Sequence, residues 1–143
     1  MKIKYGKQIQ INDLANIDID LFLCAENHEK RSYTFYNKLI LKNKISKSIV
    51  FCYKESVSDC VEITLNKIKI NDHIEIFDVL DREFCKLKKS DISIVVDYSC
   101  MTKSWYYSII LYLKNKKIEK EHITVYFAYT PAKFNEPKLP KPN

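Results

Sequence analysis

Residues 91–107 read Asp-Ile-Ser-Ile-Val-Val-Asp-Tyr-Ser-Cys-Met-Thr-Lys-Ser-Trp-Tyr-Tyr, an apolar run followed by a group of reactive side chains. The run from Ile92 to Val96 has the length and the β-branched content of a buried strand, and the residues after it begin a helical pattern. Open α/β sheets bind their ligands at the carboxyl ends of the strands. We therefore expect a strand that delivers the following residues to a ligand site: Asp97, Ser99, Cys100, Thr102 and Lys103.

Strand-like and helix-like segments alternate along the rest of the chain. The predicted strands cover residues 21–25, 48–53, 74–80, 92–96 and 123–129. The predicted helices carry apolar stripes at Tyr33, Tyr36, Leu39 and Ile40, at Val57, Val61, Leu65 and Ile68, and at Trp105, Ile109, Tyr112 and Leu113, with a short helical or turn segment at 84–87. Such alternation is typical of a parallel sheet. We expect an α/β fold, a three-layer Rossmann-like or flavodoxin-like sandwich with about five mainly parallel strands.

The 143 residues suffice for one domain with a sizeable core. We expect this domain to span residues 1–130, with residues 1–16 forming an edge hairpin or edge strand around Gly6. Residues 131–143 contain four prolines among Lys and Asn, which predicts an extended tail or linker. Whether the chain is one lobe of a longer protein is left open by the sequence.

The composition argues against a membrane protein and against a cysteine-based framework. No apolar stretch is long enough to cross a bilayer, and the first residues lack the apolar core of a signal peptide, so we expect a cytoplasmic protein. The five cysteines are an odd number with wide spacings and no Cys-x-x-Cys. We therefore expect neither a disulfide framework nor a metal site.

The formal charge of +6 raises the question of a nucleic-acid partner. The lysines are scattered rather than packed in a stripe with interleaved aromatic residues, so we do not expect nucleic-acid binding. Only Arg31 and Arg82 of the 24 basic residues are arginines. Arg31 therefore stands out, because its planar guanidinium can bind an anion through two parallel hydrogen bonds.

Two loops are expected to meet at the point where the winding direction of the sheet reverses. One loop covers residues 26–31 after the first strand, and the other covers residues 97–103 after the fourth. Asp97 and Glu26 are the candidate general bases. The candidate ligand-binding residues are Arg31, His28, Ser99, Thr102 and Lys103. The free amides at the start of the following helix would favour an anionic group there.

Each candidate also has a structural interpretation. Asp97 could cap the following helix or pair with Lys103, and Ser99 is a better candidate for an N-cap than for a nucleophile. Cys100 could have a lowered pKa at a helix start or be an inert structural thiol. Glu26 and Arg31 could form a local ion pair instead of facing a ligand.

Several common sites are excluded because Gly6 is the only glycine. The chain has no Gly-rich dinucleotide fingerprint and no Walker-type phosphate loop. It also has no nucleophile elbow and no His-Glu-x-x-His motif. We expect no cofactor.

The Glu26 and Arg31 loop, together with the motif Asp97-Tyr-Ser-Cys-Met-Thr-Lys103, resembles an uncharacterised bacterial α/β family with a Glu/Arg loop and an Asp-x-Ser-Ser-Met-Arg-like motif. The resemblance covers roughly residues 20–137 and includes Phe127-Ala-Tyr-Thr-Pro131 and Phe134-Asn-Glu-Pro137. It implies a Rossmann-like fold and an association with antiphage defence. This chain has Cys100 in place of the second Ser and Lys103 in place of Arg, which puts an anion-fork role of that position in doubt.

A second resemblance is to TIR domains. The segment Ile19-Asp-Leu-Phe-Leu-Cys-Ala-Glu26 is similar to their first strand and acidic loop, and Ser104-Trp105 is similar to part of a helix motif. The catalytic glutamate of TIR NAD hydrolases would fall near Ile109 and is absent. The resemblance therefore implies a scaffold rather than an NAD hydrolase.

Three function classes follow from these observations. The first is a module of a bacterial defence or signalling system that binds or senses a small anionic, nucleotide-like ligand between the two loops. The second is a non-enzymatic, TIR-like protein-interaction domain, with a partner bound through the tail at 131–143. The third is a hydrolase with Asp97 or Glu26 as general base. The sequence identifies neither the ligand nor the oligomeric state.

Overall fold

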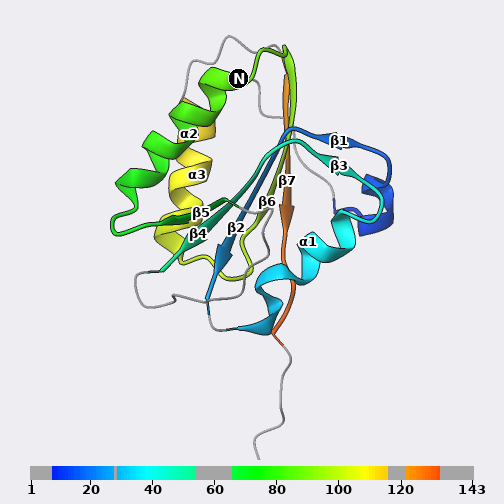
Figure 1. Ribbon diagram of the computed structural model, residues 1–143, viewed down its shortest axis with the longest axis horizontal. Coiled ribbons are helices and arrows are strands. Elements are labelled where there is room, and N and C mark those ends of the chain that lie inside the picture. Colours follow the sequence, from blue (N-terminus) through cyan, green and yellow to red (C-terminus); the bar gives the residue numbers. More distant parts are fainter. Residues whose placement is uncertain (1–7, 28, 54–65, 116–121, 133–143) are drawn as a thin grey trace, which may run out of the picture.

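A parallel sheet of five strands forms the centre of the computed structural model, which describes residues 8–27, 29–53, 66–115 and 122–132 (Figure 1). The strands are β2 (Leu21–Glu26), β4 (Ser48–Cys52), β5 (Asn66–Lys69), β6 (Asp91–Asp97) and β7 (His122–Ala128). Their order across the sheet is β5-β4-β2-β6-β7. With helices on both faces, this sheet is a three-layer Rossmann-like α/β fold, as expected from the sequence.

The two faces of the sheet carry different helices. The 3₁₀ helix η2 (Lys30–Tyr33) and helix α1 (Thr34–Leu39) cover one face, whereas α2 (Ile74–Lys86) and α3 (Lys103–Asn115) lie together on the other (Figure 1). Alternate residues of β2 therefore enter two separate cores, with Phe22 and Cys24 facing α1 and with Leu23 and Ala25 facing α2 and α3. Such two-sided burial explains why β2 and β4 are continuous apolar runs.

The winding direction reverses between β2 and β6. These two strands are neighbours, with Leu21 opposite Ile94 and Leu23 opposite Val96. The chain moves outward from β2 to β4 and β5, and then crosses back to β6 and β7. The expected adjacency of the first and fourth sheet strands is therefore confirmed, and it brings the loops after β2 and β6 to the same edge.

Short elements precede the central strands. Strands β1 (Asp18–Ile19) and β3 (Lys44–Ile45) pair in parallel just before β2 and β4, and the 3₁₀ helix η1 (Ile11–Leu14) precedes them. The hairpin or edge strand predicted within residues 1–16 is wrong at its second half, because Ile11–Leu14 form the 3₁₀ helix η1. Residues 1–7 lie outside the described part of the chain.

The third strand was predicted in the wrong place. Residues 74–80 are the beginning of helix α2, which also contains most of the segment 84–87, and the third strand of the sheet is β5. The alternation in Ile74-Glu-Ile76 is also compatible with a helix, because Ile76, Val79, Leu80 and Phe84 recur with helical spacing and are buried. Asp72 accepts a hydrogen bond from the Ile74 amide, a helix-start signal that the prediction missed.

The remaining element predictions have mixed outcomes. Helix α3 is confirmed, with Trp105, Ile109, Tyr112 and Leu113 all buried. The predicted helix through Ile68 is wrong at its end, because Ile68 lies in β5 opposite Phe51, and its residues 57–65 lie outside the described ranges. Residues 133–143 of the predicted tail also lie outside them. None of the described helices is long and apolar enough to cross a membrane.

Candidate functional site

The loops that follow β2, β6 and β7 join at the carboxyl edge of the sheet. The Ser32 hydroxyl, in η2 after β2, donates to the Cys100 sulfur after β6 over 3.6 Å. Arg31 donates from Nη1 to the carbonyl oxygen of Thr130, just after β7, over 3.0 Å. The two loops predicted from the sequence are therefore in direct contact, and a third loop joins them.

Asp97 ends β6 and is almost completely buried, with 1% of its surface exposed. Its Oδ1 accepts hydrogen bonds from both the amide (3.0 Å) and the hydroxyl of Ser99, whereas its Oδ2 has no partner among the described residues. Burial raises the pKa of Asp97, and the Ser99 hydrogen bonds and the charge of Arg31 oppose that rise. Asp97 is thus an incompletely satisfied buried carboxyl group.

A chain of three hydrogen bonds links Asp97 to Arg31. The Ser99 hydroxyl donates to Asp97 and accepts from the Thr130 amide over 2.7 Å, and the Thr130 carbonyl accepts from Arg31. The Ser99 hydroxyl thus uses its one proton and one of its two acceptor sites to hold Asp97 and Thr130 together. Ser99 is also not the N-cap of α3, which begins at Lys103. We refer to Asp97, Ser99, Thr130 and Arg31 as the relay.

The Arg31 side chain is held from several sides and is 18% exposed. Its Nε donates to Glu29 in an ion pair, and its Nη1 also donates to the Tyr129 hydroxyl over 3.3 Å. The hydrogen bond to Tyr129, followed by the interactions with Glu29, raises the pKa of Arg31, so the group remains charged. Within the described residues, no acceptor faces Nη2, which leaves one side of the planar guanidinium for a ligand.

Glu26 lies on the same side of the sheet but has different partners. It is buried at the end of β2, forms an ion pair with Lys67 of β5 (3.2 Å) and accepts from the Cys52 thiol (3.5 Å). Burial, reinforced by Glu26, raises the pKa of Tyr33. The ion pair suggested between Glu26 and Arg31 is thus replaced by separate pairs with Lys67 and Glu29, and neither Glu26 nor Asp97 faces open solvent.

The start of α3 is fixed by Tyr53, at the end of β4. The Tyr53 ring stacks on Trp105 with centroids 4.1 Å apart. Its hydroxyl donates to the Cys100 carbonyl (2.6 Å) and accepts from the Thr102 amide (2.9 Å). Thr102 and Lys103 are themselves exposed, so the first turn of α3 presents an ammonium group and a hydroxyl, the latter paired with the Ser104 hydroxyl (3.1 Å), at the surface. Among the described residues, the amides of Lys103 and Ser104 are the ones at this start without an acceptor.

The buried thiols have the properties of structural groups. Burial raises the pKa of Cys100 and of Cys24, and burial together with Glu26 raises that of Cys52 to about 11. Cys100 is therefore not the activated thiol that its place before a helix could have produced. Within the described ranges, no three His, Cys, Asp or Glu side chains gather as metal ligands.

Sequence reasoning found some of the residues at this edge and missed others. The structure brings Arg31, Ser99 and Asp97 together through the relay and places Thr102 and Lys103 at the start of α3; His28 lies outside the described residues. Ser32 and the positioning role of Tyr53 were missed. A sequence signal for this loop was Asn27, a residue type that favours turns. Its side chain accepts a hydrogen bond from the Glu29 amide (2.7 Å), which turns the chain after β2.

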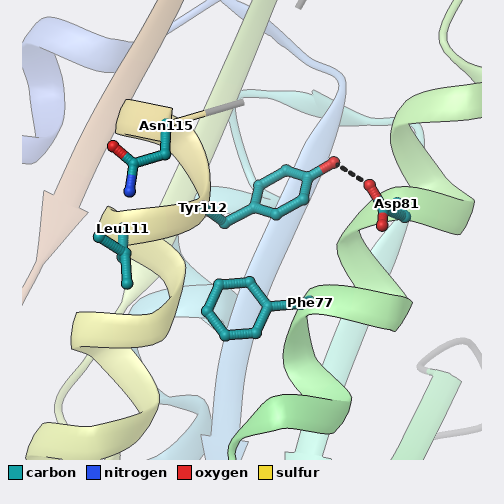
Figure 2. Close-up of a pocket in the computed structure, with 5 residues that line it drawn as sticks. All are labelled: Phe77, Asp81, Leu111, Tyr112 and Asn115. Carbon is teal, nitrogen blue, oxygen red and sulfur yellow. Dashed lines mark hydrogen bonds between the residues drawn. The ribbon is translucent and has the colours of Figure 1, made fainter. Parts of the chain in front are cut away.

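Two hollows of the surface lie away from this edge. One, of about 320 Å³, lies between α2 and α3 and is lined by Phe77, Asp81, Leu111, Tyr112 and Asn115 (Figure 2). In it the Tyr112 hydroxyl points at Asp81 and donates to it over 2.9 Å (Figure 2). The other, of about 200 Å³, lies beside η1 and α1. Neither is lined by any residue of the relay.

No known family model, curated protein or solved structure matches this chain. The geometry of the carboxyl edge is therefore the basis on which a function is proposed below.

Proposed function

We propose that this chain binds a small anionic, nucleotide-like ligand at the carboxyl edge of its sheet, between Arg31 and the start of α3. The observation that carries the proposal is the fixed guanidinium of Arg31, which is hydrogen-bonded through Nε and Nη1 and has no acceptor for Nη2 among the described residues. A fork-shaped donor held in place loses little entropy when it binds a phosphate or a carboxylate.

The first turn of α3 supplies the second half of such a site. Thr102 and Lys103 are exposed there, and a helix N-terminus favours an anion through its dipole and through its first amides, here those of Lys103 and Ser104. Arg31 is already paired with Glu29, whereas Lys103 has no ion pair within the part of the chain that the structure describes, so Lys103 and the helix start provide the positive potential. A phosphate with hydroxyl-bearing groups attached would use both donors.

Asp97 acts in this proposal as a positioning residue. It holds Ser99, Ser99 holds Thr130, and Thr130 fixes Arg31. The role in a bacterial defence or signalling system is supported by the resemblance to the family with the Glu/Arg loop.

A second candidate function is hydrolysis with Asp97 as general base. The raised pKa of Asp97 and its Oδ2, which has no partner within the described ranges, favour it, since both occur in catalytic carboxyl groups. It requires the 98–102 loop to open, because only 1% of Asp97 is exposed. Release of inorganic phosphate from ATP that is lost in Asp97→Asn would support this function, whereas release that persists in that variant would exclude it.

Thermal unfolding with ATP, AMP, cyclic dinucleotides and inorganic phosphate tests the binding proposal. We expect at least one of these anions to raise the melting temperature of the wild type. The increase should disappear in Arg31→Ala and become smaller in Arg31→Lys, which keeps the charge but loses the planar fork. Arg82→Ala, at the only other arginine, is the matched control and should retain the full increase. No increase with any of these anions, or an equal increase in Arg31→Ala, would contradict the proposal.

A further inference from the structure

Five aromatic rings gather where β7 ends and α3 begins. Tyr98 lies at the centre, with ring centroids 5.6 Å from Tyr106, 6.4 Å from Phe127 and 5.4 Å from Tyr129. Tyr107 extends the group, at 4.9 Å from Tyr106. These residues come from three separate segments, and we call them the aromatic surface.

The outer rings of this surface face solvent. Tyr107 is 59% exposed, Tyr129 54% and Phe127 49%. The Arg31 guanidinium lies over the Tyr129 ring at 5.6 Å, whereas no cation of the described segments lies over Tyr107 or Phe127. Large rings grouped at a surface are typical of a binding site.

The charged residues in the segments that form the aromatic surface are all positive. Residues 98–115 and 122–132 contain no Asp or Glu, but they contain Lys103 and Lys114. Lys103 lies three and four residues before Tyr106 and Tyr107, so the three share a face of α3. The relay places Arg31 at the other side of the surface, beside Tyr129, where Glu29 pairs with it, so the net positive charge of the surface comes from Lys103 and Lys114. This distribution is complementary to a polyanion.

We propose that the aromatic surface binds single-stranded nucleic acid, with bases stacked on Tyr107 and Phe127 and phosphates near Lys103 and Arg31. Stacking on exposed aromatic rings beside basic groups is how single strands are bound without base readout. Tyr106 and Tyr98 lie between the two outer rings, so the surface is wider than one base and requires an oligonucleotide. This inference goes beyond the proposed function, which concerns one small anion at Arg31. From the sequence we did not expect nucleic-acid binding; the rings come together only in the fold.

Fluorescence anisotropy with a labelled twelve-nucleotide oligothymidylate at low salt tests this inference. Each of Tyr107→Leu and Phe127→Leu keeps an apolar side chain but removes the ring, and should weaken binding by about tenfold or more. Tyr107→Phe should bind like the wild type. The control Leu41→Ala removes an exposed apolar side chain elsewhere, 79% exposed, and should also leave binding unchanged. Thymidine monophosphate should compete poorly.

Absence of oligonucleotide binding would overturn the inference, as would binding that both leucine variants retain. A wild-type dimer that Phe127→Asp dissociates in light scattering, without oligonucleotide binding, would show instead that the surface is a protein interface. The two proposals can fail separately. If the oligonucleotide binds through the rings but no small anion shifts the melting temperature, this inference is supported and the proposed function is contradicted. If a small anion shifts the melting temperature through Arg31 but the oligonucleotide does not bind, the proposed function is supported and this inference is contradicted.

Discussion

Two buried aspartates occur at opposite edges of the same sheet, and their surroundings differ. Asp20, just before β2, uses both oxygens: Oδ1 accepts from Lys89 (2.9 Å) and Oδ2 from the Ser93 amide (2.9 Å). Asp97, at the end of β6, uses Oδ1 twice and leaves Oδ2 without a described partner. One carboxylate is fully compensated, and the other is not.

Asp20 has the contacts of a structural group, whereas the unequal contacts of the two Asp97 oxygens are one basis of our proposal that this edge has a function. Asp20 joins the beginnings of β2 and β6, and its hydrogen bonds offset the cost of its burial. Asp97 is held in a less favourable state, with its pKa raised by burial. Native structures rarely leave a buried carboxylate oxygen unpartnered, so such an atom at the ligand edge of an α/β sheet points to function.

Removing the compensated carboxylate should have the largest effect on stability. In Asp20→Ala the Ser93 amide loses its acceptor, and the free energy of unfolding should fall by about 1–3 kcal/mol from that group alone. Asp20→Asn keeps an acceptor and should lose less. Urea unfolding measures both; an Asp20→Ala protein as stable as the wild type would show that Asp20 is not a structural group.

The matching change at the other edge should have the opposite sign. Asp97→Asn retains an acceptor for Ser99 and removes the charge that burial disfavours. Its free energy of unfolding at pH 7 should equal that of the wild type or exceed it by up to about 1 kcal/mol. A loss as large as that of Asp20→Ala would remove the distinction between the two aspartates.

Because the pKa of Asp97 is raised, the difference in free energy of unfolding between the wild type and Asp97→Asn should depend on pH. Because the folded protein binds this proton more tightly than the unfolded chain, the stabilisation from protonated Asp97 is complete below the unfolded pKa, near 3.9. It is lost as the pH rises through the folded pKa. Wild type should therefore lose stability relative to Asp97→Asn over that window, and urea unfolding of both proteins between pH 4 and 8 should show a growing gap. A constant gap would mean that the pKa is not raised.

The smallest expected effect concerns the thiols near Asp97. Cys24, Cys52 and Cys100 are buried with raised pKa values, so they should not react with a thiol reagent in the folded protein at pH 8. A Cys60→Ser, Cys85→Ser variant removes the other two cysteines. Its thiols should react only after unfolding in urea. Rapid reaction of one thiol in the folded variant would restore Cys100 as a candidate nucleophile.

The sequence predicted the parts of the fold that depend on long apolar runs. Strands β2, β4, β6 and β7 and helix α3 were found because their burial leaves a clear pattern, and the adjacency of β2 and β6 followed from winding rules. Helix α2 was missed because Ile74-Glu-Ile76 fits either period over so short a length. Strand β5 carries Lys67 and Lys69 at a sheet edge and so lacks an apolar signal.

The residues at the carboxyl edge could be named from the sequence, but their partners could not. Arg31 and Glu29 are close in the chain, yet Arg31 also binds Thr130, and Glu26 pairs with a lysine of β5. Such pairings depend on the order of strands and on the geometry of loops, which local patterns do not encode. The position of Asp97 at the end of a buried strand was predictable from the sequence. The difference between its two oxygens, of which only Oδ1 accepts hydrogen bonds from the described residues, was not predictable.

Calorimetric titration tests the central claim that the relay end of the sheet binds an anion and that the Asp20 end is structural; the titrant is whichever of ATP, AMP, cyclic dinucleotides and inorganic phosphate raises the melting temperature most. Wild type and Asp20→Asn should bind this anion with the same affinity. Ser99→Ala breaks the link between Asp97 and Thr130 without touching Arg31, and should weaken binding several-fold because the guanidinium is less well positioned. Equal affinity in all three proteins, or no binding by the wild type, would contradict the account.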